Sequence, residues 1–140
     1  GEVYLTDIVK LAVKQGLLVE RYIAAAPLDV LGVNSRVELA DAQNELQIRR
    51  NKILMLQGVS MNQPATISVS PESLVGKDTV LGPGVTISDG SHIGQSCRID
   101  QGTILQNCQI GDRAIIGPYS FLSNCTVAAN TTLEPFSKKC

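Results

Sequence analysis

Residues 69–137 decide the fold, and they read VSPESLVGKDTVLGPGVTISDGSHIGQSCRIDQGTILQNCQIGDRAIIGPYSFLSNCTVAANTTLEPFS. An aliphatic residue recurs there every six positions, with a five-residue step before Ile104 and another before Val127. The twelve positions are Val69, Val75, Leu81, Ile87, Ile93, Ile99, Ile104, Ile110, Ile116, Leu122, Val127 and Leu133. A small or β-branched residue follows each by four positions, and these are Ser73, Thr79, Val85, Ser91, Cys97, Thr103, Cys108, Ala114, Ser120, Thr126, Thr131 and Ser137.

This hexapeptide repeat is typical of β-solenoids. In a triangular coil each hexad forms one side, the aliphatic residue points inward, and the small residue fits the corner where glycine or asparagine frees the backbone. Twelve hexads at three a turn predict about four coils around a columnar core. The alternative is chance spacing in a Val- and Ile-rich β-sandwich, which twelve successive hexads with only two slips disfavour.

The first 36 residues follow another pattern. Thr6 or Asp7 can cap a helix whose apolar positions end at Gly16, and Leu17–Ala26 is predicted to be a strand. A helix and one strand make half of a βαβ unit, so residues 1–36 are interpreted as the tail of an α/β domain.

A second helix is predicted to begin at Ser35, which forms a capping box with Glu38, and to continue through Leu56. Residues 47–52 are almost wholly polar, which favours a bridging helix with little packing at mid-span. The predicted domains are therefore residues 1–36, a linker helix over 37–57, and a β-helix over 58–140.

Composition excludes several classes of protein. The net charge is -1 with mixed signs, so nothing points to a nucleic-acid or membrane partner. The sequence contains no long apolar run and no basic-then-apolar segment of secretory type, and its start at Gly1 leaves the true N-terminus open. The four cysteines include no C-x-x-C pair, so they are predicted to be mainly buried, reduced thiols of a cytoplasmic protein.

Two segments, with the helix and the hexads after them, resemble one family. Gly1–Asp7 is similar to the G-E-x-Y-[LI]-T-D segment of bacterial N-acetylglucosamine-1-phosphate uridylyltransferases, and Val30–Arg36 is similar to their V-x-G-V-N-[NS]-R segment. The resemblance implies a mainly β fold, a left-handed parallel β-helix preceded by a long linker helix and the tail of an α/β nucleotidyltransferase domain. This hand is an exception to the usual right-handed crossover.

The resemblance also implies an activity. In that family the N-terminal domain couples N-acetylglucosamine 1-phosphate to UTP, giving UDP-N-acetylglucosamine for cell-wall peptidoglycan and lipopolysaccharide. In the bifunctional enzymes the β-helix acetylates glucosamine 1-phosphate from acetyl-CoA. The implied partners are UTP and N-acetylglucosamine 1-phosphate, reached through a domain outside this chain, and further copies of the chain in a homotrimer.

Three residues carry over from the family. Asn34 matches an asparagine that helps to hold the catalytic Mg2+, a role that suits a hard amide oxygen. Tyr4 and Thr6 fall where the family contacts the substrate's sugar. The structural alternatives are a turn and cap for Asn34, a core edge for Tyr4 and a helix cap for Thr6.

Other family features are missing from this chain. The glycine-rich nucleotide loop and the aspartate that gives the other Mg2+ ligand are absent, so the chain alone is predicted to be inactive in uridylyl transfer. His92 does not match the family's catalytic histidine and is predicted to be a solvated corner imidazole. After Glu134 the sequence ends in Lys138–Cys140 where the family continues with an arginine-rich stretch. The alternatives are a sequence cut at this point and a natural short form without acetyl transfer, and the polar end favours the second.

Three hypotheses stay open. The chain is the C-terminal part of a uridylyltransferase with Asn34 completing a metal site; or a purely structural trimerisation module; or a free-standing hexapeptide acetyltransferase that uses acetyl-CoA. The third is disfavoured by the lack of a matching histidine and of further coils. The first two are compatible, because a solenoid can assemble an enzyme whose chemistry lies upstream.

Overall fold

The computed structural model describes residues 4, 6–24, 30 and 32–140. The chain divides into two compact units, residues 1–33 and 34–140, and each is described here by itself. No helix among the described residues is both long enough and apolar enough to cross a membrane.

The first unit contains helix α1 (Asp7–Lys14), close to the predicted range. Thr6 holds the N-cap position, but its side chain makes no capping hydrogen bond. The carboxylate of Asp7 instead accepts a hydrogen bond from the backbone N–H of Tyr4 at 3.1 Å. None of the described residues of this unit is buried, and the apolar side chains of the helix are exposed: Ile8, Val9, Leu11 and Val13.

The strand predicted over Leu17–Ala26 is wrong for the part that the structure describes. Residues 17–24 form neither strand nor helix, and no described strand pairs with them. An apolar run becomes a strand only when its backbone groups pair with a neighbour. The sequence pattern alone does not provide that neighbour.

Helix α2 (Arg36–Leu56) opens the second unit with the predicted capping box. The Ser35 hydroxyl accepts from the backbone N–H of Glu38 at 3.1 Å, and the Glu38 carboxylate accepts from the N–H of Ser35 at 3.0 Å. Both orphan donors are thereby satisfied, which fixes the start of the helix. The helix ends at Leu56, as the sequence predicts.

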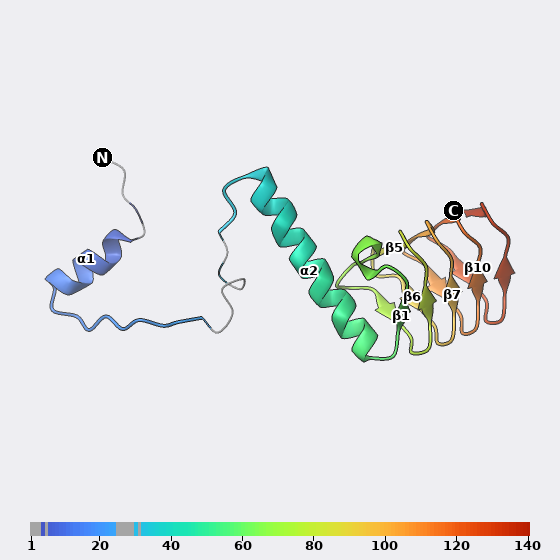
Figure 1. Cartoon of the computed structure of the whole chain (residues 1–140), viewed down its shortest axis with the longest axis horizontal. Coiled ribbons are helices and arrows are strands. Elements are labelled where there is room, and N and C mark those ends of the chain that lie inside the picture. Colours follow the sequence, from blue (N-terminus) through green and yellow to red (C-terminus); the bar gives the residue numbers. More distant parts are fainter. Residues whose placement is uncertain (1–3, 5, 25–29, 31) are drawn as a thin grey trace. The chain divides into compact units, whose positions relative to one another are not determined.

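Short strands follow α2 and build a solenoid, seen in Figure 1 as stacked arrows from green to red. The strands and the one 3-10 turn are β1 (Ser60–Met61), η2 (Pro64–Thr66), β2 (Ser68–Val69), β3 (Leu74–Val75), β4 (Val80–Leu81), β5 (Thr86–Ser88), β6 (His92–Ile93), β7 (Arg98–Ile99), β8 (Ile104–Gln106), β9 (Gln109–Ile110), β10 (Ile115–Ile116), β11 (Phe121–Ser123), β12 (Thr126–Val127), β13 (Thr132–Leu133) and β14 (Lys138–Lys139). They form three parallel sheets, which we call sheet A (β1-β4-β7-β10-β13), sheet B (β2-β5-β8-β11-β14) and sheet C (β3-β6-β9-β12).

Each of the first four turns contributes one strand to each sheet, the last adds only β13 and β14, and the solenoid has about five turns. Inward residues stack in register, so that Leu81 pairs with Ile99 and Ile99 with Ile116. The expected number of four coils is too low because the six-residue count begins at Val69 and ends at Leu133. It misses β14, which pairs with β11, and β1, whose Met61 pairs with Leu81 across a longer first turn that contains η2.

The predicted register is wrong at two positions. Leu105, and not Ile104, is the inward residue of β8: Leu105 has no exposed surface, whereas Ile104 is half-buried. Likewise Cys125, and not Thr126, takes the small-residue position before Val127, since Thr126 is exposed.

Asparagine causes both short steps. Asn107 and Asn124 adopt left-handed backbone conformations with φ of 48° and 49°. Each makes a corner with one residue, where the preceding turn of the solenoid uses two, Asp89 and Gly90, at φ 55° and 70°. The chain therefore shortens after Leu105 and not before Ile104.

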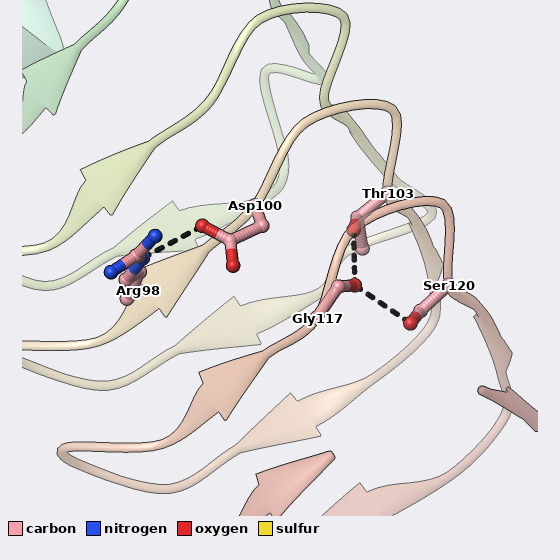
Figure 2. Close-up of polar contacts among 5 residues, drawn as sticks. All are labelled: Arg98, Asp100, Thr103, Gly117 and Ser120. Carbon is pink, nitrogen blue, oxygen red and sulfur yellow. Dashed lines mark hydrogen bonds and ion pairs between the residues drawn. The ribbon is translucent and has the colours of Figure 1, made fainter. Parts of the chain in front are cut away.

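Buried hydroxyls close the corners. Thr103 and Ser120 are both buried, and both donate to the carbonyl oxygen of Gly117, at 3.2 and 2.7 Å (Figure 2). A buried carbonyl at a turn needs such a partner because strand pairing does not reach it. The small-residue position of the hexad thus combines a fit in volume with hydrogen bonding.

The polar stretch of α2 packs against the first turn of the solenoid, contrary to the prediction of little packing there. Asn51 is buried and donates to the carbonyl oxygens of Pro64 and Ile67, at 2.8 and 2.9 Å. Arg50 donates to the carbonyl of Ser73 at 2.6 Å, and Gln47 accepts from the hydroxyl of Ser68 at 3.0 Å. The polar side chains of this segment therefore attach α2 to the solenoid by hydrogen bonds, most of them to backbone carbonyls.

Candidate functional site

Asn34 lies immediately before the capping residue of α2, and its side chain is exposed. Its backbone N–H donates to the Glu38 carboxylate at 2.6 Å, the same oxygen that accepts from Ser35. The side-chain amide makes no hydrogen bond to any residue that the structure describes. The Glu38 carboxylate therefore holds the backbone of Asn34, while the carboxamide is exposed.

The described residues do not form a metal site around Asn34. Glu38 is the carboxylate bonded to this segment, and it already caps the helix. Among the described residues no group of three histidine, cysteine, aspartate or glutamate side chains is arranged to hold a metal ion. A Mg2+ ion prefers about six oxygen ligands, and this part of the chain offers one amide oxygen.

Tyr4 and Thr6 lie in the other unit, ahead of α1. Both are exposed, and the backbone carbonyl of Tyr4 accepts from the N–H of Asp7 at 2.9 Å. The structural roles considered for these two residues are not observed: Tyr4 is exposed and not at a core edge, and the Thr6 hydroxyl makes no capping hydrogen bond.

His92 lies on strand β6 and points outward from sheet C, so its prediction as a corner residue is wrong, while its exposure is confirmed. It pairs in register with Leu74 on one side and Gln109 on the other. This face borders a groove of about 580 Å³, which Gln95, Asp112 and Thr126 also line.

The groove has few of the features of a catalytic centre. The carboxylate of Asp112 accepts from the backbone N–H of Gln95 at 2.9 Å, and none of the described residues hydrogen-bonds the imidazole of His92. General base catalysis requires the imidazole to be oriented within hydrogen-bond reach of the reacting proton. Besides the imidazole, the groove offers apolar surface and four polar side chains, those of Gln95, Gln109, Asp112 and Thr126.

The residues of this groove could have been found from the sequence. In each hexad the residue before the inward aliphatic points out, and every third such residue falls on the same sheet. Applied to sheet C, this rule selects Leu74, His92, Gln109 and Thr126. The six-residue spacing of the inward positions does not by itself indicate this outward face.

The four cysteines are free thiols. Cys97 and Cys108 are buried, as predicted, while Cys125 is half-buried and Cys140 is exposed. Cys108 and Cys125 occupy the same corner in successive turns, with their Sγ atoms 3.9 Å apart.

Comparisons with known proteins match either the solenoid or nearly the whole chain. The family described as GMPPB C-terminal domain matches residues 62–138, which cover most of the solenoid. The chain is 53% identical over 130 residues to the bifunctional protein GlmU of Desulfotalea psychrophila, covering 93% of this chain and 38% of that protein. It is 35% identical over 136 residues to the bifunctional protein GlmU of Geotalea uraniireducens, covering 97% of this chain and 30% of the relative.

A third relative is the bifunctional protein GlmU of Thermodesulfovibrio yellowstonii, 35% identical over 137 residues, with 98% of this chain and 30% of that protein covered. The chain thus spans about a third of the length of the curated relatives it matches. The match to the Desulfotalea psychrophila protein is with its C-terminal part.

Proposed function

The chain belongs to the family described as GMPPB C-terminal domain and is homologous to bifunctional GlmU proteins, and from this premise we propose that it is part of an N-acetylglucosamine-1-phosphate uridylyltransferase. The longer protein, called the parent protein below, makes UDP-N-acetylglucosamine from UTP and N-acetylglucosamine 1-phosphate. This chain supplies its solenoid and one edge of its active site.

The observation that carries the proposal is the state of Asn34. Its backbone is fixed by Glu38 at the start of α2, while its carboxamide is exposed and makes no bond within the described residues. An exposed amide on a backbone that is held in place can contribute one oxygen to a Mg2+ site whose other ligands come from the rest of the parent protein. Tyr4 and Thr6 are both exposed, and we propose that their hydroxyl groups contact the sugar of N-acetylglucosamine 1-phosphate.

The test is the rate of pyrophosphate release by the parent protein from UTP and N-acetylglucosamine 1-phosphate. We expect Asn34→Ala to lower kcat/KM at least about tenfold, the scale of losing a group that supports a metal site. It should also raise the Mg2+ concentration needed for half-maximal rate. The matched control is Asn44→Ala, which removes another exposed asparagine at mid-helix in α2.

Two results would count against this assignment. Unchanged kinetics in Asn34→Ala would remove Asn34 from the site. An equal loss in Asn44→Ala would mean that the effect comes from the helix and not from the amide.

Assembly is the second part of the proposal. The outward face of sheet A carries Val80 and Ile115, which are 37% and 40% exposed, and sheet C carries Leu74 at 57%. Burying such side chains against further copies of the chain is favourable, which supports a solenoid that holds three copies together.

Acetyl transfer is the alternative function, and one observation favours it. His92 borders the groove along sheet C, where a donor such as acetyl-CoA and an amino sugar could be placed. An assay for acetylation of glucosamine 1-phosphate, with His92→Ala beside the unchanged protein, tests it. Acetylation that depends on His92 would favour this alternative.

A further inference from the structure

We propose that Cys108 and Cys125 are a redox-active pair, which a peroxide oxidises to a disulfide that links two successive turns of the solenoid. The two thiols face each other across one step of the stack, with Sγ atoms 3.9 Å apart. Nothing in the proposed activity uses either side chain.

The backbone geometry suits a disulfide. Strands β9 and β12 pair in register, Gln109 with Thr126, so the residues just before them are also neighbours. The backbone N–H of Gln109 donates to the carbonyl of Cys125 at 3.0 Å, which fixes the spacing at this corner. Neighbouring strands lie about 4.8 Å apart, within the range of about 4.4–6.8 Å between the Cα atoms of disulfides.

Only the side chains need to move. Bond formation brings the sulfurs from 3.9 Å to about 2.05 Å. The thiol of Cys108 now lies 3.2 Å from the carbonyl oxygen of Gln106, a weak contact that rotation about χ1 would release. The turns themselves can keep their hydrogen bonds.

Exposure decides which thiol reacts first. Cys108 is fully buried, whereas Cys125 is half-buried and so is open to a small oxidant. The Cys125 thiolate attacks one peroxide oxygen, the O–O bond breaks, and hydroxide leaves, giving a sulfenic acid. Cys108 then loses its proton and attacks the Cys125 sulfur; the S–O bond breaks and water leaves, so two thiols lose two hydrogens in total.

The surroundings set the pH dependence of the first step. Burial raises the pKa of the Cys125 thiol, and the neighbouring Cys108 and Cys140 raise it further, while the Lys139 ammonium lowers it. Because the thiolate is the nucleophile, the reaction is slow at neutral pH. Its rate increases as the pH rises through this raised pKa.

The other two cysteines provide internal comparisons. Cys97 is buried at another corner, where its sulfur lies 3.2 Å from the carbonyl oxygen of Gly111 and no second thiol is within hydrogen-bond reach. Cys140 is exposed and near enough to influence Cys125, so it is the competing partner. The proposal requires that Cys125 form its disulfide with Cys108 and not with Cys140.

The experiment oxidises the full chain with hydrogen peroxide, blocks the remaining thiols and maps tryptic peptides by mass spectrometry. Cleavage after Arg98, Arg113 and Lys138 places Cys108 in residues 99–113 and Cys125 in residues 114–138. We expect these two peptides joined, with a mass lower by two hydrogens, and a faster yield at higher pH. The oxidised chain should unfold at a temperature several degrees higher, because the bond constrains the unfolded chain.

Matched variants follow from the repeat itself. Cys108→Ser should abolish the joined peptide and still fold, because Ser91 occupies the same corner one turn earlier. Cys97→Ser should leave the joined peptide in place. The proposal is overturned if the unchanged chain gives no joined peptide, if Cys125 is found with Cys140, or if Cys125 is converted only to sulfinic acid.

Discussion

Leu105 and Ile104 are adjacent in sequence but occupy different environments, and this pair shows how the repeat sets the core. Leu105 is fully buried between Ile87 and Leu122 of the neighbouring turns. Ile104 faces outward from the same strand. Because successive side chains of a strand point to opposite faces, Leu105 lies in the columnar core and Ile104 lies on the surface.

Substitution of the two residues distinguishes the observed register from the one that spacing alone predicts. Leu105→Ala should lower the free energy of unfolding by about 2–5 kcal/mol, because it leaves a cavity in a packed column. Ile104→Ala is the matched control and should cost clearly less. Chemical denaturation of both variants measures the difference, and a larger loss for Ile104→Ala would contradict the structure.

The sequence could predict most inward residues but not where the register slips. Eleven of the twelve predicted aliphatic positions lie inward, with Ile104 as the exception, and eleven of the predicted small residues hold their position, with Thr126 as the exception. The slips depend on whether a corner uses one left-handed residue or two, as at Asn107 against Asp89 and Gly90. The spacing of aliphatic residues does not indicate how many residues a corner uses. The asparagines do indicate a left-handed corner residue, because asparagine adopts that conformation more readily than most residues.

At the scale of elements, helix α2 shows tertiary contacts overriding a local pattern. Its capping box was predictable, because the partners lie three residues apart in the sequence. Its docking was not, because the acceptors for Asn51 are carbonyls of η2 and of the loop before β2. The sequence alone predicts that these polar side chains face solvent. In the structure they form hydrogen bonds with backbone groups of the first turn.

Asn51→Leu should therefore weaken the docking of α2 although it increases apolar character. The change leaves two carbonyls, those of Pro64 and Ile67, without their donor, which costs about 1–3 kcal/mol for buried groups. Hydrogen exchange of the last turns of α2 should become faster. Asn44→Leu serves as control on the exposed part of the helix, and equal exchange in both variants would argue against the docking contact.

At the scale of the whole molecule, the described residues divide into a well-packed column and a segment without a core. The solenoid holds nearly all the buried apolar residues, and the first unit holds none among its described residues. The sequence predicted this contrast through the hexads and the incomplete βαβ pattern. It could not predict how Tyr4 and Thr6 relate to Asn34, because no pattern in the sequence pairs these residues.

The proposed trimer makes a prediction at this scale. Static light scattering at micromolar concentration should give three times the mass of one chain. Placing a charge on the apolar face of sheet A, as in Ile115→Glu, should reduce that mass, whereas Thr126→Glu on sheet C tests whether the other face takes part. A mass of one chain for the unchanged protein would contradict the proposed assembly.

Pyrophosphate release from UTP and N-acetylglucosamine 1-phosphate with Mg2+ tests the central claim most directly, when it is measured on this chain alone and on the parent protein. The account predicts release by the parent protein and none by the chain, because Asn34 is one oxygen ligand and the groups that must position the triphosphate lie elsewhere. Release by the chain alone, or none by the parent protein, would contradict it.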